Sequence, residues 1–346
     1  MKIKDLNTQG ILNKKNINSK FLSVFNDKLQ IDCNVLNSNF FLDSFNFFPI
    51  TEDNNSFKDL FSWGDLSKYE NFYTKNFNKI FNERKKNLKS FSNTIVLGSS
   101  TTDNYYRNMI TFFPRIFFIS EKEINIAIHR NSSNKWRIFI SKILEQLKIK
   151  INKYVYLDDD FYIFKKSQIP QFFDESVSIK ILKKCLLIEQ KEKKLNVYVS
   201  RQNSKSRNLI NEEDIINELK SKNFMIIDTK NMSIFEQIDI FSSAQIIISP
   251  TGSALTNIIF CSEGTKIIEI IPKYNFGYEQ SFKNRYLKIC NILNLNYEFI
   301  EADPIENNKL NVKIEKFISK KALKESNYYK DLLIEKNKFI NLIKNY

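Results

Sequence analysis

Two arginines that follow a short apolar run are the side chains of this sequence best suited to bind a phosphate. The buried-strand pattern at residues 195–199 runs into Ser200 and Arg201, and Arg207 follows in the same loop. Two guanidinium groups in one loop can grip a diphosphate through paired hydrogen bonds. The alternative is a pair of solvated arginines in a basic surface loop, where each contributes little.

A segment with a glycine at its centre offers a second way to hold an anion. Thr251, Gly252 and Ser253 precede an apolar stretch that runs past Asn257. The first N–H groups of a helix lack partners within the helix, and the helix dipole attracts negative charge. A glycine also lets a phosphate approach the backbone closely. The alternative is an ordinary Pro-Thr-Gly turn that Ser253 caps.

Acidic residues and one histidine suggest three further sites, each with a structural alternative. Glu269, at the end of a predicted strand, could accept hydrogen bonds from ribose hydroxyls, or it could pair with a cation or cap a helix. The three aspartates at 158–160 could place two carboxylates around a divalent ion, or they could form a solvated turn in a hairpin. His129 has a side chain suited to a general base, or it is a structural histidine.

The scarcity of certain residue types excludes several other kinds of site. The chain of 346 residues has a single histidine, which rules out a zinc site with two imidazoles. Its six glycines form neither GxGxxG nor a Walker A loop. The four cysteines form no CxxC pair, a pattern typical of free thiols in a reducing compartment.

The charge and hydropathy indicate a folded cytoplasmic protein with a basic surface. The net charge is +14, and 42% of the residues are hydrophobic, enough for a large core. We find neither an apolar run long enough for a membrane helix nor a signal peptide. The partners considered are a nucleotide, an acidic polymer and a peripheral contact with an anionic membrane. We expect no nucleic-acid partner, because no recognised motif accompanies the charge.

Alternating apolar and amphipathic stretches predict an α/β protein in two halves, with a charged linker at residues 189–194. In the first half we expect strands at 94–98, 115–119, 124–128 and 154–157 and a helix at 134–148. In the second half we expect strands at 195–199, 224–227, 245–248, 266–270 and 297–300, with helices capped at Asn211 and Ser233, then at 254–261 and 278–293. This alternation predicts a parallel, doubly wound sheet. Ligands of such sheets bind beyond the carboxyl ends of the strands, where the candidate anion-binding residues lie.

Five short motifs, in order along the chain, resemble those of the family 61 glycosyltransferases. Residues 104–108 and 113–115 resemble the family pattern NYxHW…lPR, and Ser200, Arg201, Arg207, Asn211 and Glu212 resemble SR…R…NE. Gln237 matches the EQ position, residues 249–257 with Phe260 resemble GxHGAGLTNxxF, and Glu269 with Pro272 matches vvEixP. Each motif is short, but their common order makes the resemblance specific.

The resemblance implies an inverting glycosyltransferase that moves a sugar from a nucleotide-sugar donor to a glycan or related acceptor, as in capsular or surface polysaccharide biosynthesis. It implies two Rossmann-like domains of the GT-B type that face across a cleft, with no metal cofactor. We expect an acceptor-side domain at residues 1–188 and a nucleotide-sugar-binding domain at 195–311. A helical segment at 312–346 would pack back on the first domain.

The resemblance also assigns roles to individual residues. The donor side would consist of Arg201, Arg207, Thr251, Gly252, Ser253, Asn257 and Glu269. The acceptor side would consist of Asn104 and Tyr105, with Arg107 beside them. Catalysis is assigned to Asp103 and Arg107.

Two positions depart from the family pattern. The family has histidine where this chain has Arg107 and Thr251. Arg107 can donate to an anion but cannot act as a base at neutral pH, and Thr251 can hydrogen-bond a phosphate without charge. Asp103 is therefore our replacement base. The alternative is a degenerate family member that binds nucleotide or glycan without turnover.

Overall fold

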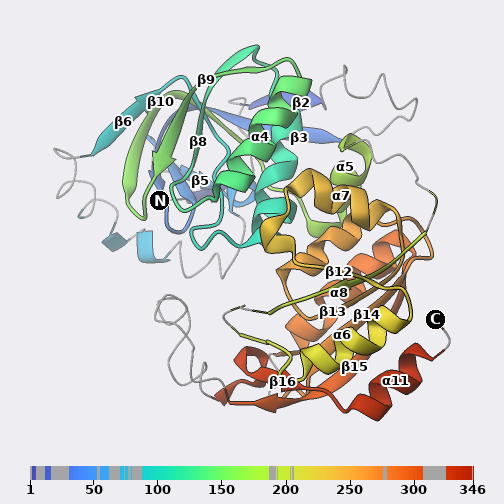
Figure 1. Cartoon of the computed structure of the whole chain (residues 1–346). Coiled ribbons are helices and arrows are strands. Elements are labelled where there is room, and N and C mark those ends of the chain that lie inside the picture. The colour runs from blue at the N-terminus through green and yellow to red at the C-terminus, as the bar shows by residue number, and fades with distance from the viewer. Residues whose placement is uncertain are drawn as a thin grey trace. The chain divides into compact units, whose positions relative to one another are not determined.

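The chain folds into two compact units, Met1–Leu186 and Leu187–Tyr346, which are described separately. The computed structural model describes residues 2–4, 12–16, 31–52, 55–61, 71–73, 75–76, 79, 88–186, 192, 194–202, 204, 206–275, 279–306, 325–344 and 346. Most of the predicted linker at 189–194 lies outside these residues. The protein is a mixed α/β structure with two large sheets and packed helices (Figure 1).

Unit 1 is built on an eight-stranded mixed sheet. Its central order is β2-β3-β10-β7-β8-β9, with β4 paired to β3 and β6 paired to β10. The strands are β2 (Leu12–Asn16), β3 (Asp32–Asp43), β4 (Phe48–Thr51), β6 (Lys89–Ser92), β7 (Thr94–Val96), β8 (Glu123–His129), β9 (Lys150–Leu157) and β10 (Phe161–Pro170). A small parallel pair consists of β1 (Lys2–Lys4) and β5 (Asn55–Phe57). The strands β7, β8 and β9 are parallel, so their carboxyl ends meet at one edge.

The helices of unit 1 connect and cover these strands. They are η2 (Lys58–Leu60), α3 (Tyr105–Arg107), η4 (Asn108–Phe112), η5 (Phe113–Phe118), α4 (Asn134–Gln146) and α5 (Glu175–Cys185). The helix predicted at 134–148 is confirmed, and the side chain of Ser133 caps it by accepting from the N–H of Trp136.

Two predictions for unit 1 are wrong. The run at 115–119 is not a strand but part of the 3-10 helix η5, which begins with Pro114 near its first position. Proline suits a helix start, because it has no N–H to satisfy there. The aspartates at 158–160 connect two strands, β9 and β10, as the turn interpretation predicts, but these strands do not form a hairpin. β9 pairs with β8, whereas β10 pairs with β3, β6 and β7.

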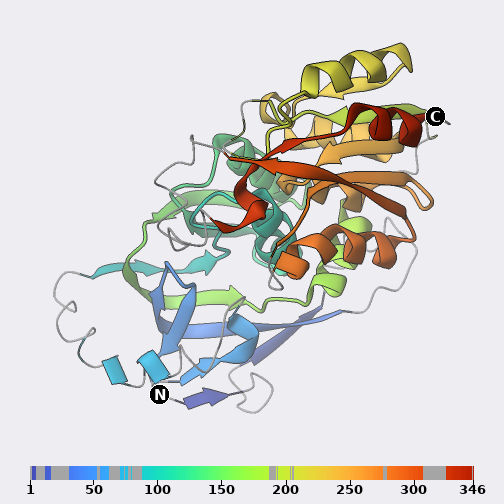
Figure 2. The same ribbon diagram turned by 90° about the horizontal axis from the view of Figure 1, so that it is seen from below.

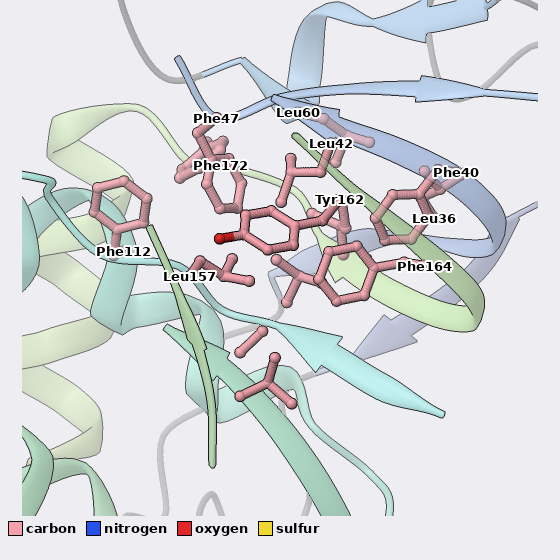
Figure 3. Packing of buried hydrophobic residues seen from close by; sticks show 14 of the residues in the cluster. Leu36, Phe40, Leu42, Phe47, Leu60, Phe112, Leu157, Tyr162, Phe164 and Phe172 are labelled. Carbon is pink, nitrogen blue, oxygen red and sulfur yellow. The ribbon is translucent and has the colours of Figure 1, made fainter. Parts of the chain in front are cut away.

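The core of unit 1 is mainly aromatic. Phe47, Phe112 and Phe172 meet edge to face around one point, with ring centroids 5.3 to 5.5 Å apart. Tyr162 and Phe164 extend the same cluster from β10 toward residues of β8 and β9 (Figure 3). Phe40 and Phe47 are therefore core residues of this sheet.

Unit 2 contains a six-stranded sheet whose first five strands are parallel. The strand order is β12-β11-β13-β14-β15-β16. The strands are β11 (Leu195–Val199), β12 (Met225–Ile227), β13 (Ala244–Pro250), β14 (Lys266–Pro272), β15 (Asn296–Ile305) and β16 (Asp331–Leu333). In chain order the parallel strands are arranged 2-1-3-4-5, so the direction of winding reverses between β11 and β13. Doubly wound sheets bind ligands at such a switch point.

Helices cover both faces of this sheet, which is why its strands read as nearly continuous Ile and Val runs. The helices are α6 (Glu212–Ser221), η6 (Thr229–Asn231), α7 (Ile234–Ser242), η7 (Ser253–Phe260), α8 (Gln280–Leu293), η9 (Asn327–Tyr329) and α11 (Lys336–Ile343). Figure 2 shows α6 and α11 on one side of the sheet and α8 on the other. The capping box of Ser233 and Glu236 at α7 is confirmed. Asn211 precedes α6, but its side chain instead bonds the backbone of Ile334.

The C-terminal segment differs from the prediction in two ways. It is not wholly helical, because β16 adds a sixth, antiparallel strand beside β15. The apolar residues of α11, Phe339 and Ile343, are buried with Ile215 and Leu219 of α6. We expected the helical segment at 312–346 to pack back on the first domain, but the apolar residues of α11 belong to the core of unit 2. No helix in the described part of the chain is long and apolar enough to cross a membrane.

Candidate anion-binding site in unit 2

The loop after β11 brings Arg201 to the switch point of the sheet. Glu212, buried at the start of α6, holds the loop, because its Oε1 accepts from the N–H of Arg201 (3.0 Å) and from the hydroxyl of Tyr198 (2.9 Å). The Nη2 of Arg201 donates to the carbonyl of Ser206 (3.0 Å), and its Nε is buried without a partner. Burial and the neighbouring charge of Arg207 lower the pKa of Arg201 to about 10, so it stays cationic at neutral pH.

Gly252 makes room for this guanidinium. The backbone at Gly252 is extended, at φ 171° and ψ 168°, a conformation open to any residue. A Cβ at this position would lie 1.8 Å from Nη1 of Arg201, so only glycine permits the observed packing. Tyr286 fixes the same peptide, because its hydroxyl donates to the Gly252 carbonyl at 2.6 Å. The structure thus brings together two residues that are far apart in the sequence.

Arg207 is the second arginine of the pair. Its loop is hydrogen-bonded to β16. Its φ of 59° lies in the left-handed region, which non-glycine residues rarely adopt. Asn208 stabilises this turn: its N–H and its Nδ2 both donate to Asp331, at 2.8 and 3.0 Å. The Nε and Nη1 of Arg207 are buried without hydrogen-bond partners. Strained backbone and unpartnered donors at one residue are typical of a binding position.

Glu269 is a fully buried carboxyl in the middle of β14, whereas the sequence predicted it at the end of a strand. Burial raises its pKa to about 7, although Thr251, Tyr297 and the charges of Arg285 and Arg207 act in the opposite direction. The hydroxyl of Tyr297 donates to its Oε2 at 2.7 Å, while Oε1 is buried without a partner. This carboxyl can therefore be neutral or ionised near physiological pH, and it can donate to or accept from a bound hydroxyl.

The other residues predicted for the donor side fall into different environments. Thr251 is buried, and its N–H donates to the Ile270 carbonyl at 2.8 Å. Ser253 begins η7 and is partly exposed. The Nδ2 of Asn257 donates to Gln237 at 2.8 Å, which joins η7 to α7. Asn257 is fully buried.

Tyr328 and Arg285 lie beside Arg207, and neither was predicted from the sequence. Tyr328, from η9, lies with its ring 4.3 Å from the guanidinium carbon of Arg207. The guanidinium groups of Arg207 and Arg285 lower the pKa of its phenol, against the effect of burial. These residues come from separate loops and helices, so no local spacing could have identified them.

The predicted acceptor-side and catalytic residues lie together at the start of α3 in unit 1. Asn104 caps α3, because its Oδ1 accepts from the N–H of Arg107 at 3.1 Å. Tyr105 and Arg107 are partly exposed. Asp103 adopts a left-handed φ of 51° and accepts from Nδ2 of Asn108 at 3.0 Å. Burial raises the pKa of Asp103, although hydrogen bonds from Ser133 and Asn108 oppose the shift.

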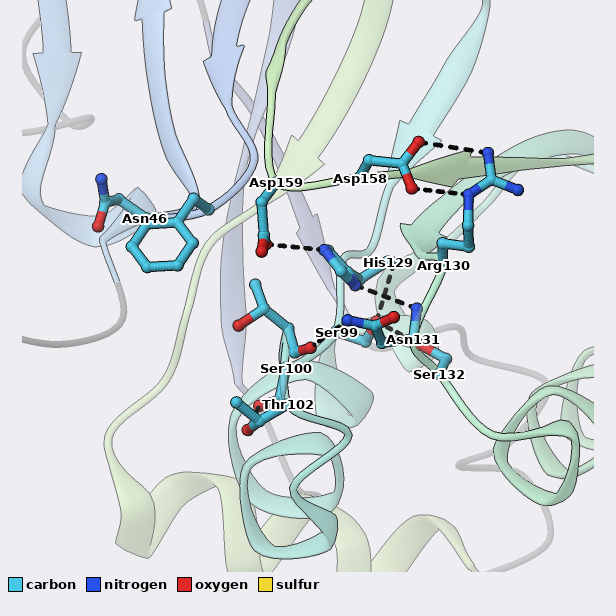
Figure 4. A network of polar contacts seen from close by, with 12 residues as sticks. Asn46, Ser99, Ser100, Thr102, His129, Arg130, Asn131, Ser132, Asp158 and Asp159 are labelled. Carbon is cyan, nitrogen blue, oxygen red and sulfur yellow. Dashed lines mark hydrogen bonds and ion pairs between the residues drawn. The ribbon is translucent and has the colours of Figure 1, made fainter. Parts of the chain in front are cut away.

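The other residues that suggested chemistry form a polar network at the carboxyl ends of β8 and β9 (Figure 4). His129 Nδ1 accepts from the Asn131 N–H (3.1 Å), and Nε2 faces Asp159 Oδ1 at 3.0 Å. Both ring nitrogens are therefore engaged, which argues against a free base. Asp158 pairs with Arg130 at 2.7 Å. Among the described residues, no group of three or more His, Cys, Asp or Glu side chains is arranged to hold a metal ion.

Arg115, which belongs to the motif at residues 113–115, is buried and has a structural role. Its Nη2 donates to the carbonyls of Val96 (2.9 Å) and Leu97 at the end of β7. Its guanidinium lies 4.1 Å from the ring centroid of Phe172 and also faces Phe47. Burial lowers its pKa to about 9.

A comparison with known protein families supports the resemblance. Residues 105–268 match the family model described as Glycosyltransferase 61. This region covers less than half of the chain, from α3 to β14, and includes Arg201, Arg207 and Gly252. The match supports glycosyltransferase family 61, and with it a glycosyltransferase activity in general terms. No curated protein matches the chain.

Proposed function

We propose that this protein is an inverting glycosyltransferase that moves a sugar from a nucleotide-sugar donor to a glycan or related acceptor in polysaccharide biosynthesis. The observation that carries the proposal is the pairing of Arg201 and Arg207 at the switch point of the unit 2 sheet. Their unpartnered nitrogens need acceptors, and no carboxylate of the described residues forms an ion pair with either side chain. The oxygens of a diphosphate provide such acceptors.

The same two arginines suit the leaving group of the reaction. In an inverting displacement, a base takes the proton of the acceptor hydroxyl while its oxygen attacks the anomeric carbon. The bond from that carbon to the phosphate oxygen breaks, and its electron pair leaves on the diphosphate. Fixed guanidinium groups stabilise the developing charge. We therefore propose a reaction without a metal cofactor, with Asp103 as the base and Arg107 beside it.

The remaining donor-side roles follow from the geometry. We propose that Glu269 binds a ribose hydroxyl through its unpartnered Oε1, and that Ser253 contributes from the start of η7. Thr251, Gly252 and Asn257 shape the site, Gly252 by admitting the Arg201 side chain. Asn104 and Tyr105 would line the acceptor side. We further propose that both units adopt the GT-B arrangement of two Rossmann-like domains.

We propose that the reaction takes place in the cytoplasm, with a peripheral contact to an anionic membrane surface. The four cysteines are buried free thiols, as expected in a reducing compartment. The net charge of +14 favours an anionic surface. A capsular or surface polysaccharide pathway is the setting that the family resemblance suggests.

Isothermal titration with a panel of nucleoside diphosphates tests the donor site. We expect at least one to bind the wild-type protein and to bind the Arg201→Ala variant at least tenfold more weakly, the loss expected for a charge-assisted hydrogen bond. Absence of binding to every nucleotide, or equal binding by Arg201→Ala, would contradict the proposal. Binding without any consumption of nucleotide-sugar donors would favour the alternative, a degenerate family member.

A further inference from the structure

The short segment that carries Tyr328 is fixed to the loop after β14. Glu279, which is fully buried, accepts hydrogen bonds from the Ser326 hydroxyl and from the N–H of Tyr328 (3.3 Å). The N–H of Asn327 donates to Oδ1 of Asn275 at 3.2 Å, and Nδ2 of Asn275 donates back to the Glu325 carbonyl at 2.9 Å. Reciprocal bonds of this kind hold η9 in one position.

The ring of Tyr328 is held between a cation and another aromatic ring. Its centroid lies 4.0 Å from that of Phe282, with the planes 20° apart. The guanidinium of Arg207 lies 4.3 Å from the Tyr328 ring, and that of Arg285 lies 5.3 Å from the Phe282 ring. The two arginines and the two rings therefore form one packed group, and Tyr328 remains partly exposed.

The neighbours of the phenol determine which groups can take its proton. The guanidinium groups of Arg207 and Arg285 act on the Tyr328 phenol, and that of Arg207 also lies over its ring. Guanidinium groups only donate, so neither of them can accept the phenol proton. That proton can therefore be donated to a third group. Burial alone raises the pKa of Tyr328, but the charges and hydrogen bonds of Arg207 and Arg285 outweigh it and lower that pKa, which strengthens the phenol as a donor.

Buried donors without hydrogen-bond partners lie in the same region and interact electrostatically with this phenol. They are Nε of Arg201, Nε and Nη1 of Arg207, and the buried hydroxyl of Tyr274. Arg285 adds a third guanidinium to the pair already described. The buried carboxylate oxygens without partners among the described residues are single oxygens of Glu212 and Glu269. Three cations and these donors match a ligand that brings several negatively charged oxygens.

We propose that Tyr328 and Arg285 are direct ligands of the diphosphate group that Arg201 and Arg207 bind. This rests on the proposed donor site and extends it to two residues outside the matched family region. The Tyr328 hydroxyl donates to a phosphate oxygen, and Arg285 adds a second charge-assisted contact. The C-terminal segment thus contributes directly to donor binding.

Titration of the full-length protein with inorganic pyrophosphate tests this inference without requiring the nucleotide base. The variants are Tyr328→Phe, which keeps the ring, and Arg285→Gln. Tyr329→Phe is the matched control, because it removes a hydroxyl from the neighbouring ring, 5.0 Å away. We expect the dissociation constant to rise about tenfold or more for Tyr328→Phe and for Arg285→Gln, and to stay unchanged for Tyr329→Phe.

Each outcome has a defined meaning. If wild-type protein binds pyrophosphate and both variants bind it equally well, Tyr328 and Arg285 are not ligands and this inference is wrong, while the donor site stands. If wild-type protein binds neither pyrophosphate nor any nucleoside diphosphate, the proposed function fails as well. Thermal unfolding of each variant shows whether it folds. If Tyr328→Phe does not fold, the dissociation constant of Arg285→Gln decides the question.

Discussion

Replacement of Gly252 by alanine tests how the donor site is built. The new Cβ would lie 1.8 Å from Nη1 and 2.8 Å from the guanidinium carbon of Arg201, below the 3.0 Å that real Cβ atoms keep. The guanidinium is the end of a flexible side chain, so it must move by at least 1 Å while the backbone stays extended. Gly252→Ala should therefore displace Arg201 and leave the fold intact.

The size of the effect follows from the contacts that Arg201 would lose. A shift of this size takes a hydrogen bond out of its normal range of distances. A hydrogen bond to a charged group contributes about 1.5–3 kcal/mol, which corresponds to about 10- to 150-fold in the dissociation constant. The extended backbone at Gly252 accepts an alanine, so the melting temperature should change little.

A double-mutant cycle with Arg201→Ala provides the assay. Nucleoside diphosphate or pyrophosphate is titrated into the wild-type protein, Gly252→Ala, Arg201→Ala and the double variant. If Gly252 acts by admitting Arg201, Gly252→Ala has no further effect once Arg201 is removed. Equal binding by the wild-type protein and Gly252→Ala, or fully additive losses, would refute this reasoning and would favour direct contact of phosphate with the glycine backbone.

Three other substitutions give distinct readouts. Burial raises the pKa of Glu269 from 4.5 to about 7, so the folded state holds this proton more tightly than the unfolded state. The stability of wild type relative to Glu269→Gln should then fall as the pH rises from about 4.5 to about 7, by at most about 3.4 kcal/mol. The difference in melting temperature between the two proteins measures this, and a pH-independent difference would contradict it. Asp103→Asn should lower kcat at least about 100-fold with donor binding unchanged, and an active variant would remove Asp103 as the base. Arg115→Lys should cost about 1–3 kcal/mol of stability, because lysine cannot both bond the Val96 and Leu97 carbonyls and cover the Phe172 ring, and an unchanged melting temperature would contradict its structural role.

The secondary structure of unit 2 could be predicted well because local signals agree with the final packing. Its parallel strands are buried on both faces, so each is a short apolar run between polar turns. The capping box at Ser233 is a local interaction and forms as the sequence indicates. Asn211 shows the limit of this reasoning, because its side chain bonds Ile334, more than a hundred residues away, instead of capping α6.

The errors in unit 1 have a common physical cause. The apolar run around Arg115 looks like a strand, but Pro114 and the packing of the buried guanidinium on Phe172 favour a 3-10 helix. The apolar residues Tyr162 and Phe164 come soon after the aspartates, which suggests a hairpin. Their side chains lie in the core of the large sheet, and their strand β10 pairs with β3 instead of β9. In both cases tertiary contacts decide between two locally possible structures.

The proposed donor site could be predicted in part. Arg201, Arg207 and Gly252 each follow a strand that the sequence reveals, and the topology of parallel strands brings those ends together. Arg285 and Tyr328 reach the same place from α8 and η9. Their contribution depends on the path of the C-terminal segment, which the sequence pattern indicated only as a helix.

Release of nucleoside diphosphate from a panel of nucleotide-sugar donors, in the presence of glycan acceptors, tests the central claim most directly. The negative control is the Arg201→Ala/Arg207→Ala double variant, which lacks both guanidinium groups at the switch point. We expect the wild-type protein to consume at least one donor, with the divalent cations chelated, and the double variant to consume none. Consumption of no donor by the wild-type protein, or equal rates for the two proteins, would contradict the account.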